Sequence, residues 1–310
     1  MLEVIECDTA EQLLESLAPV SPHFRSPEPS RETILFRGCA DATWRLIPSA
    51  LRDAASRTLR HQVRIETDAL GRFVSECEES GLAIPNDNEK LRAQIIALSQ
   101  PGAQPPLGLE AGVTWPTDSW LGLMALAQHS GLPTRLLDWT TSPFVAAYFA
   151  ARADPGVRED THMAVWALSP FRANIASPQP GSAQAVILAH GRSVSKFIWM
   201  KDWRGFAVVD TTRAGNPNLV AQRGYLTAHV LGAVPNEVWE APWNELPLED
   251  LVDAPPSPPR LKKFVLLRRH APRLLDFLKK YGVSTATMFP GYAGIAKTVL
   301  ETPPRGPHDV

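Results

Sequence analysis

The segment from Leu126 to Ala150 constrains this chain most, because it joins two apolar helical patterns through a short polar stretch. The first pattern covers residues 118–128 and stops before Gly131, and the second covers residues 143–152 and follows Ser142, a good N-cap residue. Three side chains able to do chemistry fall between the two patterns: His129, Arg135 and Asp138. We therefore expect a functional connection between two helices, since connections carry function more often than scaffold elements do.

The composition is ordinary for a globular protein of 310 residues, with 44% hydrophobic and 21% charged residues. Its net charge of −2 argues against strong nonspecific attraction to nucleic acid but leaves a local basic groove open as an alternative. The three cysteines form no Cys-x-x-Cys pair, so neither a disulfide framework nor a metal site is predicted. No signal-peptide pattern or apolar run of membrane-spanning length is present, and we expect a cytoplasmic protein without a membrane partner.

The periodicity predicts helices in the first half of the chain and strands mainly in the second. Helices are expected at residues 61–80, 87–99, 118–128, 143–152 and 272–281. Strands are expected at residues 32–37, 163–168, 206–209, 225–230 and 264–267, and the central 163–168 strand has no polar face. Proline-rich loops are expected at residues 20–30, 101–116, 170–180, 235–260 and 302–307. This pattern favours an α+β fold over an alternating parallel sheet.

Arg37 and His129 are candidate binding residues from position and chemistry. Arg37 ends an expected strand just before Gly38, which allows a ligand or another backbone to come close. Its guanidinium can form two hydrogen bonds with a phosphate or a carboxylate, and the alternative is a structural salt bridge. His129 closes a helix, where it can bind a substrate oxygen or simply satisfy the last carbonyls.

The polar residues after His129 have similar alternatives. Arg135 and Asp138 can bind a ligand, pair with each other or brace the loop. Thr140, Thr141 and Ser142 precede a helix start, where free N–H groups bind anions and where Ser142 is expected to cap the helix in any case.

Two later features are weaker candidates. Gln222 opens an expected strand, and its amide can hold a hydroxyl group from both its donor and acceptor sides. A basic stripe interleaved with aromatic residues suits nucleic acid but also suits a snorkelling surface. The stripe contains Arg192, Lys196, Phe197, Trp199, Lys201, Trp203 and Arg204.

Several motifs together resemble the FRG-domain family, named for its Phe-Arg-Gly signature. They are LFRG at 35–38, WRLIPSALR at 44–52, QHSGLPTRLLDWTTSPFVAAYFA at 128–150, QRGY at 222–225 and GVSTATMFPGYAGIA at 282–296. The resemblance runs over about residues 3–300, which implies a single domain at 1–300 and a tail at 301–310. Members are known mainly from bacteria and phages, often near mobile or defence-type genes.

The family's layout is similar to that of ADP-ribosyltransferases, which implies a mixed β-sheet core with a helical N-terminal half. Such enzymes have an Arg or His on a first strand, a Ser/Thr-rich strand leading into a helix, and a Glu on a later strand. Arg37, with Gly38, fits the first position, and the segment 140–142 fits the second. The third position departs from the pattern, because Gln222 stands where a Glu is expected.

The resemblance implies an enzyme that cleaves the nicotinamide–ribose bond of NAD and modifies a macromolecule, either nucleic acid or protein. A role as a toxin or antiphage defence effector would follow. Arg37 and Arg135 would hold the dinucleotide, Thr140, Thr141 and Ser142 would seat the nicotinamide side, and Tyr148 or another aromatic would stack on the ring. The role of the missing Glu would fall to His129, Asp138 or Gln222.

Two other functions remain open at this point. One is a catalytically inactive nucleotide- or nucleic-acid-binding module of the same fold, which the Gln in place of Glu favours. The other is a hydrolase or nuclease that uses His129 and Asp138, although no metal-ligand spacing is present.

Overall fold

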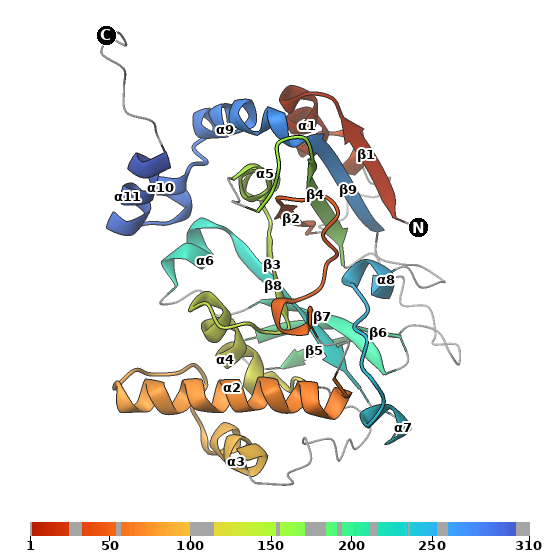
Figure 1. Cartoon of the computed structure of the whole chain (residues 1–310), viewed down its shortest axis with the longest axis vertical. Coiled ribbons are helices and arrows are strands. Elements are labelled where there is room, and N and C mark those ends of the chain that lie inside the picture. The colour runs from red at the N-terminus through yellow and green to blue at the C-terminus, as the bar shows by residue number, and fades with distance from the viewer. Residues whose placement is uncertain are drawn as a thin grey trace.

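The computed structural model combines a nine-stranded sheet with helices at both ends of the molecule (Figure 1). It describes residues 2–24, 33–53, 57–99, 115–152, 156–170, 184–190, 194–201, 203–210, 216–232, 234, 236–252 and 260–301. The proline-rich residues 253–259, the tail 302–310 and the side chains of the basic stripe before Trp203 lie outside this description. Within the described residues, no helix is long and apolar enough to cross a membrane.

The first half of the chain contains helices α1 (Ala10–Leu17), α2 (Leu59–Glu79), α3 (Glu89–Ser99), α4 (Asp118–His129) and α5 (Pro143–Ala151). Its strands are β1 (Glu3–Cys7), β2 (Leu35–Cys39) and β3 (Leu136–Thr140). The second half contains strands β4 (His162–Ser169), β5 (Gln184–His190), β6 (Val194–Lys201), β7 (Arg204–Asp210), β8 (Gly224–Leu231) and β9 (Arg260–Leu267). Its helices are α6 (Pro217–Ala221), α7 (Asn236–Trp239), α8 (Leu248–Val252), α9 (Ala271–Lys280), α10 (Thr285–Met288) and α11 (Tyr292–Glu301).

The strand order is β1-β9-β4-β2-β3-β8-β7-β6-β5, with β1 and β9 parallel and the other neighbours antiparallel. The expected α+β class is therefore confirmed. The expected central strand at 163–168 is confirmed as β4, which lies between β9 and β2 and is buried along most of its length. Its side chains alternate between two hydrophobic clusters, as a strand covered on both faces requires.

The helix boundaries follow the expected stop signals. Gly81, Gly131 and Gly282 stand just past α2, α4 and α9 with φ of 67°, 95° and 77°, a conformation that glycine adopts without a Cβ clash. The side chain of Ser142 accepts a hydrogen bond from the backbone N–H of Val145 and caps α5. These four expected helices are confirmed, and each begins or ends at the residue that its cap or stop signal indicates.

The expected connection between 128 and 143 is wrong in one important respect, since TRLLDW supplies β3 at the middle of the sheet. All five residues of β3 pair with β8, from Leu136 opposite Ala228 to Thr140 opposite Gly224. Leu136 packs on one hydrophobic cluster, whereas Leu137 and Trp139 pack on another. Long-range pairing thus makes a strand of a segment too short to signal one locally.

The first expected strand is also misplaced, because β2 runs from Leu35 to Cys39 and Arg37 lies at its centre rather than at its end. The reason is Gly38, which we expected to stop the strand. A Cβ at Gly38 would lie 2.0 Å from the carbonyl oxygen of Ala146 and 2.6 Å from the backbone nitrogen of Ala150. The glycine therefore lets β2 continue under the backbone of α5.

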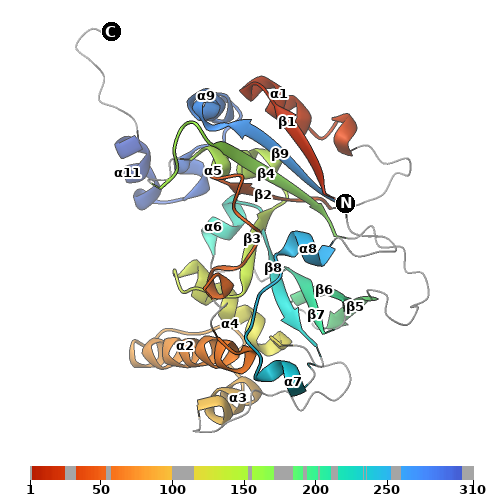
Figure 2. The ribbon, with the colours of Figure 1, turned by 45° about the vertical axis from the view of Figure 1, so that its right-hand side comes forward.

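The sheet divides between β2 and β3, which are neighbours through one residue pair, Phe36 opposite Thr140. We call strands β1, β9, β4 and β2 the β2 half-sheet, and strands β3, β8, β7, β6 and β5 the β3 half-sheet. Helices α1, α5 and α9 pack on the β2 half-sheet, and α2, α3 and α4 pack on the β3 half-sheet (Figures 1 and 2). The division leaves room for a cavity between the two halves.

Candidate functional site

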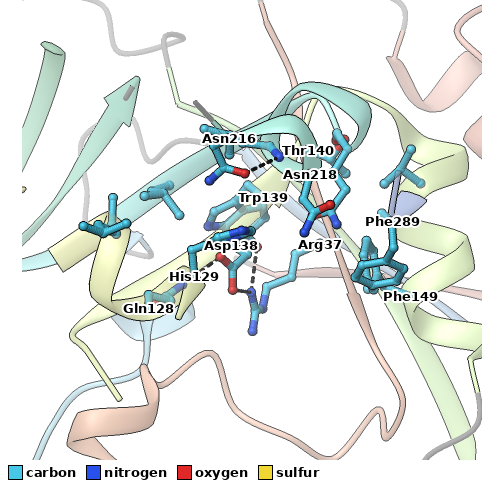
Figure 3. A pocket seen from close by; sticks show the side chains of 18 of the residues that line it. Arg37, Gln128, His129, Asp138, Trp139, Thr140, Phe149, Asn216, Asn218 and Phe289 are labelled. Carbon is cyan, nitrogen blue, oxygen red and sulfur yellow. Dashed lines mark hydrogen bonds and ion pairs between the residues drawn. The ribbon is translucent and has the colours of Figure 1, made fainter. Parts of the chain in front are cut away.

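A cavity of about 1060 Å³ lies where the two half-sheets divide. Its walls come from β2, β3, α4, α5 and α6, together with Phe289 after α10 and Lys297 on α11. We call it the larger cavity. Residues far apart in the sequence meet here, as Figure 3 shows.

Arg37 and Asp138 face each other across the division. The Nη1 atom of Arg37 donates a hydrogen bond of 2.6 Å to the main-chain oxygen of Asp138 and lies 3.9 Å from its carboxylate. Strands β2 and β3 form a main-chain pair only at Phe36, opposite Thr140. Beyond that pair, the side chain of Arg37 on β2 donates the hydrogen bond to the main-chain oxygen of Asp138 on β3. The Nε atom of Arg37 is buried and has no hydrogen-bond partner among the residues that the structure describes. The Arg37 guanidinium is thus fixed through its Nη1 atom, while its Nε atom still has a hydrogen to donate.

The Asp138 carboxylate points toward the end of α4. It shares a face of β3 with Leu136, which packs on the α2–α4 cluster. One carboxylate oxygen accepts a hydrogen bond of 2.7 Å from Gln128, whose own oxygen accepts from the hydroxyl of Thr134. The side chain of Asp138 remains 71% exposed, so it is held in place without being removed from solvent.

His129 follows Gln128 at the end of α4 and also lines the larger cavity, on the same side as Gln128 (Figure 3). The expected position of His129 at a helix C-terminus is confirmed. His129 thus lines the cavity from α4, the same helix that carries Gln128, the hydrogen-bond donor to Asp138.

Thr140 and Gln222 line the larger cavity but make structural hydrogen bonds. The hydroxyl of Thr140 donates to the main-chain oxygen of Gln222 at 2.7 Å and accepts from the main-chain nitrogen of Ser142 at 3.0 Å. The Gln222 amide donates to the carbonyl of Met288 at 3.0 Å. Gln222 closes α6 rather than opening a strand, so it links α6 to the segment after α10.

Thr141 and Ser142 are not among the residues that line the larger cavity. The main chain of Thr141 donates a hydrogen bond to the carbonyl of Arg223, and Ser142 caps α5. The structure therefore brings Thr140 to the cavity and leaves its two neighbours in the link to α5.

Arg135 and Tyr148 lie away from the larger cavity and are almost fully buried. Arg135 forms two hydrogen bonds with the carboxylate of Glu66, at 2.6 and 2.8 Å, so it does not pair with Asp138. The Tyr148 hydroxyl shares a hydrogen bond with Thr285, and burial raises the pKa of this phenol. Both side chains form hydrogen bonds within the protein core and do not line the larger cavity.

Several lining residues carried no sequence signal of their own. Phe149 faces the cavity beside Phe289, with ring centroids 6.2 Å apart (Figure 3). Phe149 could have been considered beside Tyr148 as the aromatic ligand contact, because successive side chains of a helix point about 100° apart and only one of the two can face the cavity. Three others became visible only through folding: Asn216, Asn218 and Lys297. Arg52 belongs to the WRLIPSALR motif, but no role in a site was expected for it.

The cavity has a positive balance of charged groups. Arg37, Arg52 and Lys297 contribute three permanent cations. Among the described residues, Asp138 is the only carboxylate that lines it. Nor does the described part of the chain contain a group of three or more His, Cys, Asp or Glu side chains arranged to hold a metal ion. Such a cavity suits an anionic ligand, and Asp138 presents one carboxylate to that ligand at a defined point.

Comparison with known proteins gives one match. A family model described as "FRG domain" matches residues 32–157, and no curated protein or solved structure matches the chain. The matched segment runs from β2 to just past α5 and contains Arg37, Gln128, His129 and Asp138, whereas α6 and α11 complete the cavity from outside it. The expected resemblance to the FRG-domain family is confirmed over residues 32–157.

Proposed function

We propose that this protein cleaves the nicotinamide–ribose bond of NAD and transfers the ADP-ribosyl group to a macromolecule. The observation that carries the proposal is the Arg37–Asp138 pair at the division of the sheet, where a fixed guanidinium and an accessible carboxylate meet in one cavity. Its volume of about 1060 Å³ lies just above the roughly 300–1,000 Å³ typical of ligand sites, which favours a ligand as long as a dinucleotide.

The cations of the cavity support pyrophosphate binding. Arg37 is held through Nη1 and has an unpartnered buried Nε, so it loses little side-chain entropy when it binds an anion. Arg52 and Lys297 add positive charge from two other walls. In this proposal Arg37 makes the principal contact with the pyrophosphate, because a guanidinium forms paired hydrogen bonds with phosphate oxygens.

Asp138 supplies the negative charge that the reaction needs. Cleavage of the nicotinamide–ribose bond builds positive charge on the sugar, as glycoside cleavage does. A carboxylate already oriented by Gln128 stabilises that charge without reorganising during the reaction. Asp138 thereby takes the role of the Glu that related enzymes have on a later strand. In this chain Gln222 stands at that position, and its amide donates a hydrogen bond to the carbonyl of Met288.

Phe149 and Phe289 form the aromatic wall of the cavity and are suited to stack on the nicotinamide or adenine ring. Phe149 takes this role in place of Tyr148, whose ring lies in the core. His129, on the α4 side, is available to contact the ribose hydroxyls.

The test is release of nicotinamide from NAD by the purified protein, followed by chromatography. Arg37→Gln should lower release by about 10- to 100-fold, because a charge-assisted hydrogen bond contributes about 1.5–3 kcal/mol. Arg158→Gln is the matched control, since Arg158 pairs with Asp160 on the surface, outside the cavity. Equal rates for Arg37→Gln and the native protein would reject the proposal.

A nucleotide-binding module without catalysis is the second candidate, favoured by the engagement of Gln222 with the Met288 carbonyl. It predicts that the native protein binds NAD in calorimetry, that Arg37→Gln weakens binding, and that neither protein releases nicotinamide. Measurable release by the native protein would exclude it.

A further inference from the structure

A second cavity, of about 220 Å³, lies next to the first, and we call it the smaller cavity. Four residues line both cavities: Arg37, Arg52, Gln128 and Asp138. The remaining walls of the smaller cavity are Ser49, the segment 131–133 after α4, and Leu136 and Leu137 of β3. The two cavities therefore meet at the Arg37–Asp138 pair.

The course of β3 explains why Asp138 stands at this junction. Residues Leu136 to Asp138 line the smaller cavity, and residues Asp138 to Thr140 line the larger one. On β2, Arg37 alone reaches the smaller cavity, whereas its neighbours line the larger one. A group bound in the smaller cavity would thus approach Asp138 from the Leu136 end of β3, whereas the larger cavity continues toward Thr140.

The geometry points to the smaller cavity as the acceptor site, which takes one nucleotide of a single-stranded nucleic acid, with a free sugar hydroxyl (the 2′-hydroxyl of RNA or the terminal 3′-hydroxyl of DNA) toward Asp138 and its phosphate toward Arg52. This inference rests on the proposed function, because it assigns the acceptor of the same transfer. It also gives Asp138 a contact with both substrates.

Size and charge favour this class of acceptor. A volume of 220 Å³ holds about seven water molecules at roughly 30 Å³ each, which suits the sugar of one nucleotide, with its base and phosphate reaching outward, rather than a folded surface. Arg52 is exposed, and its Nε atom donates to the carbonyl of Ile47 at 3.2 Å. No other hydrogen bond or ion pair of Arg52 occurs within the described part of the chain. Its outer nitrogens can therefore meet a phosphate.

The chemistry of the transfer balances at this junction. The acceptor hydroxyl oxygen bonds to C1′ of the NAD ribose, and the bond from C1′ to the nicotinamide nitrogen breaks. The electron pair of that bond leaves with nicotinamide, which departs as the neutral molecule. The hydroxyl proton passes to the Asp138 carboxylate and then to solvent. Water is the acceptor when no nucleic acid is present.

Ser49→Trp tests the site, because Ser49 is exposed, lines the smaller cavity and is not among the residues lining the larger one. The control is Ser75→Trp, on the exposed face of α2. Each protein is given NAD labelled in its adenylate part, with and without mixed-sequence single-stranded RNA or DNA longer than the roughly 4–16 nucleotides of a typical binding site. Melting curves verify that both variants fold.

We expect Ser49→Trp to lower label transfer to the oligonucleotide by at least about tenfold, while nicotinamide release without oligonucleotide stays within about twofold. Unchanged transfer, or an equal fall in transfer and release, would overturn the acceptor site. In a parallel reaction that also contains cell protein, label found on protein and never on oligonucleotide would overturn the acceptor class. Absence of release by the native protein would instead reject the proposed function itself.

A charge test keeps the inference falsifiable if Ser49→Trp fails to fold. Pro133 is exposed at the smaller cavity and is not among the residues lining the larger one. We expect Pro133→Glu to weaken oligonucleotide binding and Pro133→Lys to strengthen it, with the difference shrinking at high salt. Equal binding by the two variants in fluorescence anisotropy would contradict a phosphate contact at this site.

Discussion

Two arginine–carboxylate pairs arise from the same six residues, TRLLDW, and have opposite characters. Arg135 holds the carboxylate of Glu66 at 2.6 and 2.8 Å, with the two side chains only 1% and 4% exposed. Asp138, three positions later, lies 3.9 Å from Arg37 and is 71% exposed. The first pair is closed to ligands, and the second is open to them.

The difference teaches that burial, rather than residue type, separates architecture from a candidate site. A buried charge requires partners, and Arg135 has them, since it also donates to the carbonyl of His229 at 3.1 Å. Arg37 has a buried Nε without a partner, and the Asp138 carboxylate is oriented by Gln128. The open pair therefore has capacity left for a ligand.

The largest effect should come from breaking the closed pair. Arg135→Met leaves the Glu66 carboxylate buried without its cation, which should cost about 3–5 kcal/mol of unfolding free energy. Arg37→Met removes a pair whose carboxylate stays 71% exposed to solvent, so it should cost less than Arg135→Met, about 1 kcal/mol. Urea unfolding of both variants measures the contrast, and similar losses would contradict the distinction drawn between the pairs.

The surroundings of the closed pair should also make stability depend on pH. Glu245 is buried near Arg135, and burial raises the pKa of its carboxyl to about 7 from the ordinary 4.5. Its contribution to stability is therefore complete below pH 4.5 and is lost as the pH rises through about 7.

Glu245→Gln cannot lose this proton, so its stability relative to the native protein should rise by about 3 kcal/mol between about pH 5 and pH 8. His229, whose pKa is lowered by burial to about 3, is present in both proteins, and its effect cancels. Urea unfolding at each pH provides the measurement. A stability difference that does not change with pH would show that Glu245 titrates normally.

A smaller effect should follow from changing the backbone next to the open pair. Gly38→Ala places a Cβ against the backbone of α5, and such overpacking typically costs about 1–3 kcal/mol. Gly122→Ala is the control, because its Cβ would meet the flexible side chain of Asn86. Thermal unfolding should separate the two variants, and equal melting temperatures would show that β2 and α5 can move apart freely.

The smallest effects distinguish the aromatic neighbours on α5. Tyr148→Phe should cost about 1 kcal/mol of stability through the lost hydrogen bond to Thr285 and leave NAD affinity unchanged. Phe149→Leu should weaken NAD binding by about 0.5–1.5 kcal/mol through lost stacking. Calorimetry on both variants tests this, and the reverse pattern would point to Tyr148 as the ligand contact.

The sequence was sufficient where local signals agreed. Helices α2 and α9 have apolar periodicity, whereas α4 and α5 are apolar around most of the helix. All four begin or end at a recognisable Ser or Gly signal, so their positions could be predicted to within a few residues. Strand β4 could be predicted because it is apolar along its length. The FRG motifs likewise identified the segment that contributes Arg37 and Asp138 to the cavity.

The sequence was insufficient where the outcome depended on distant residues. Strand β3 is five residues long and becomes a strand through its pairing with β8, more than 80 residues away. The role of Arg135 depends on Glu66, 69 positions earlier, which no local pattern indicates. The cavity itself arises from the single pairing between β2 and β3, a property of the assembled sheet.

The role of Asp138 is tested most directly by single-turnover release of nicotinamide from saturating NAD, comparing native protein, Asp138→Asn and the surface control Asp160→Asn. Asparagine keeps the size of the side chain and its acceptor for Gln128 but removes the charge. We predict that Asp138→Asn binds NAD within about threefold of the native affinity and releases nicotinamide about 10²–10³-fold more slowly. Release at the native rate from Asp138→Asn would contradict the assignment of Asp138 as the carboxylate of the reaction.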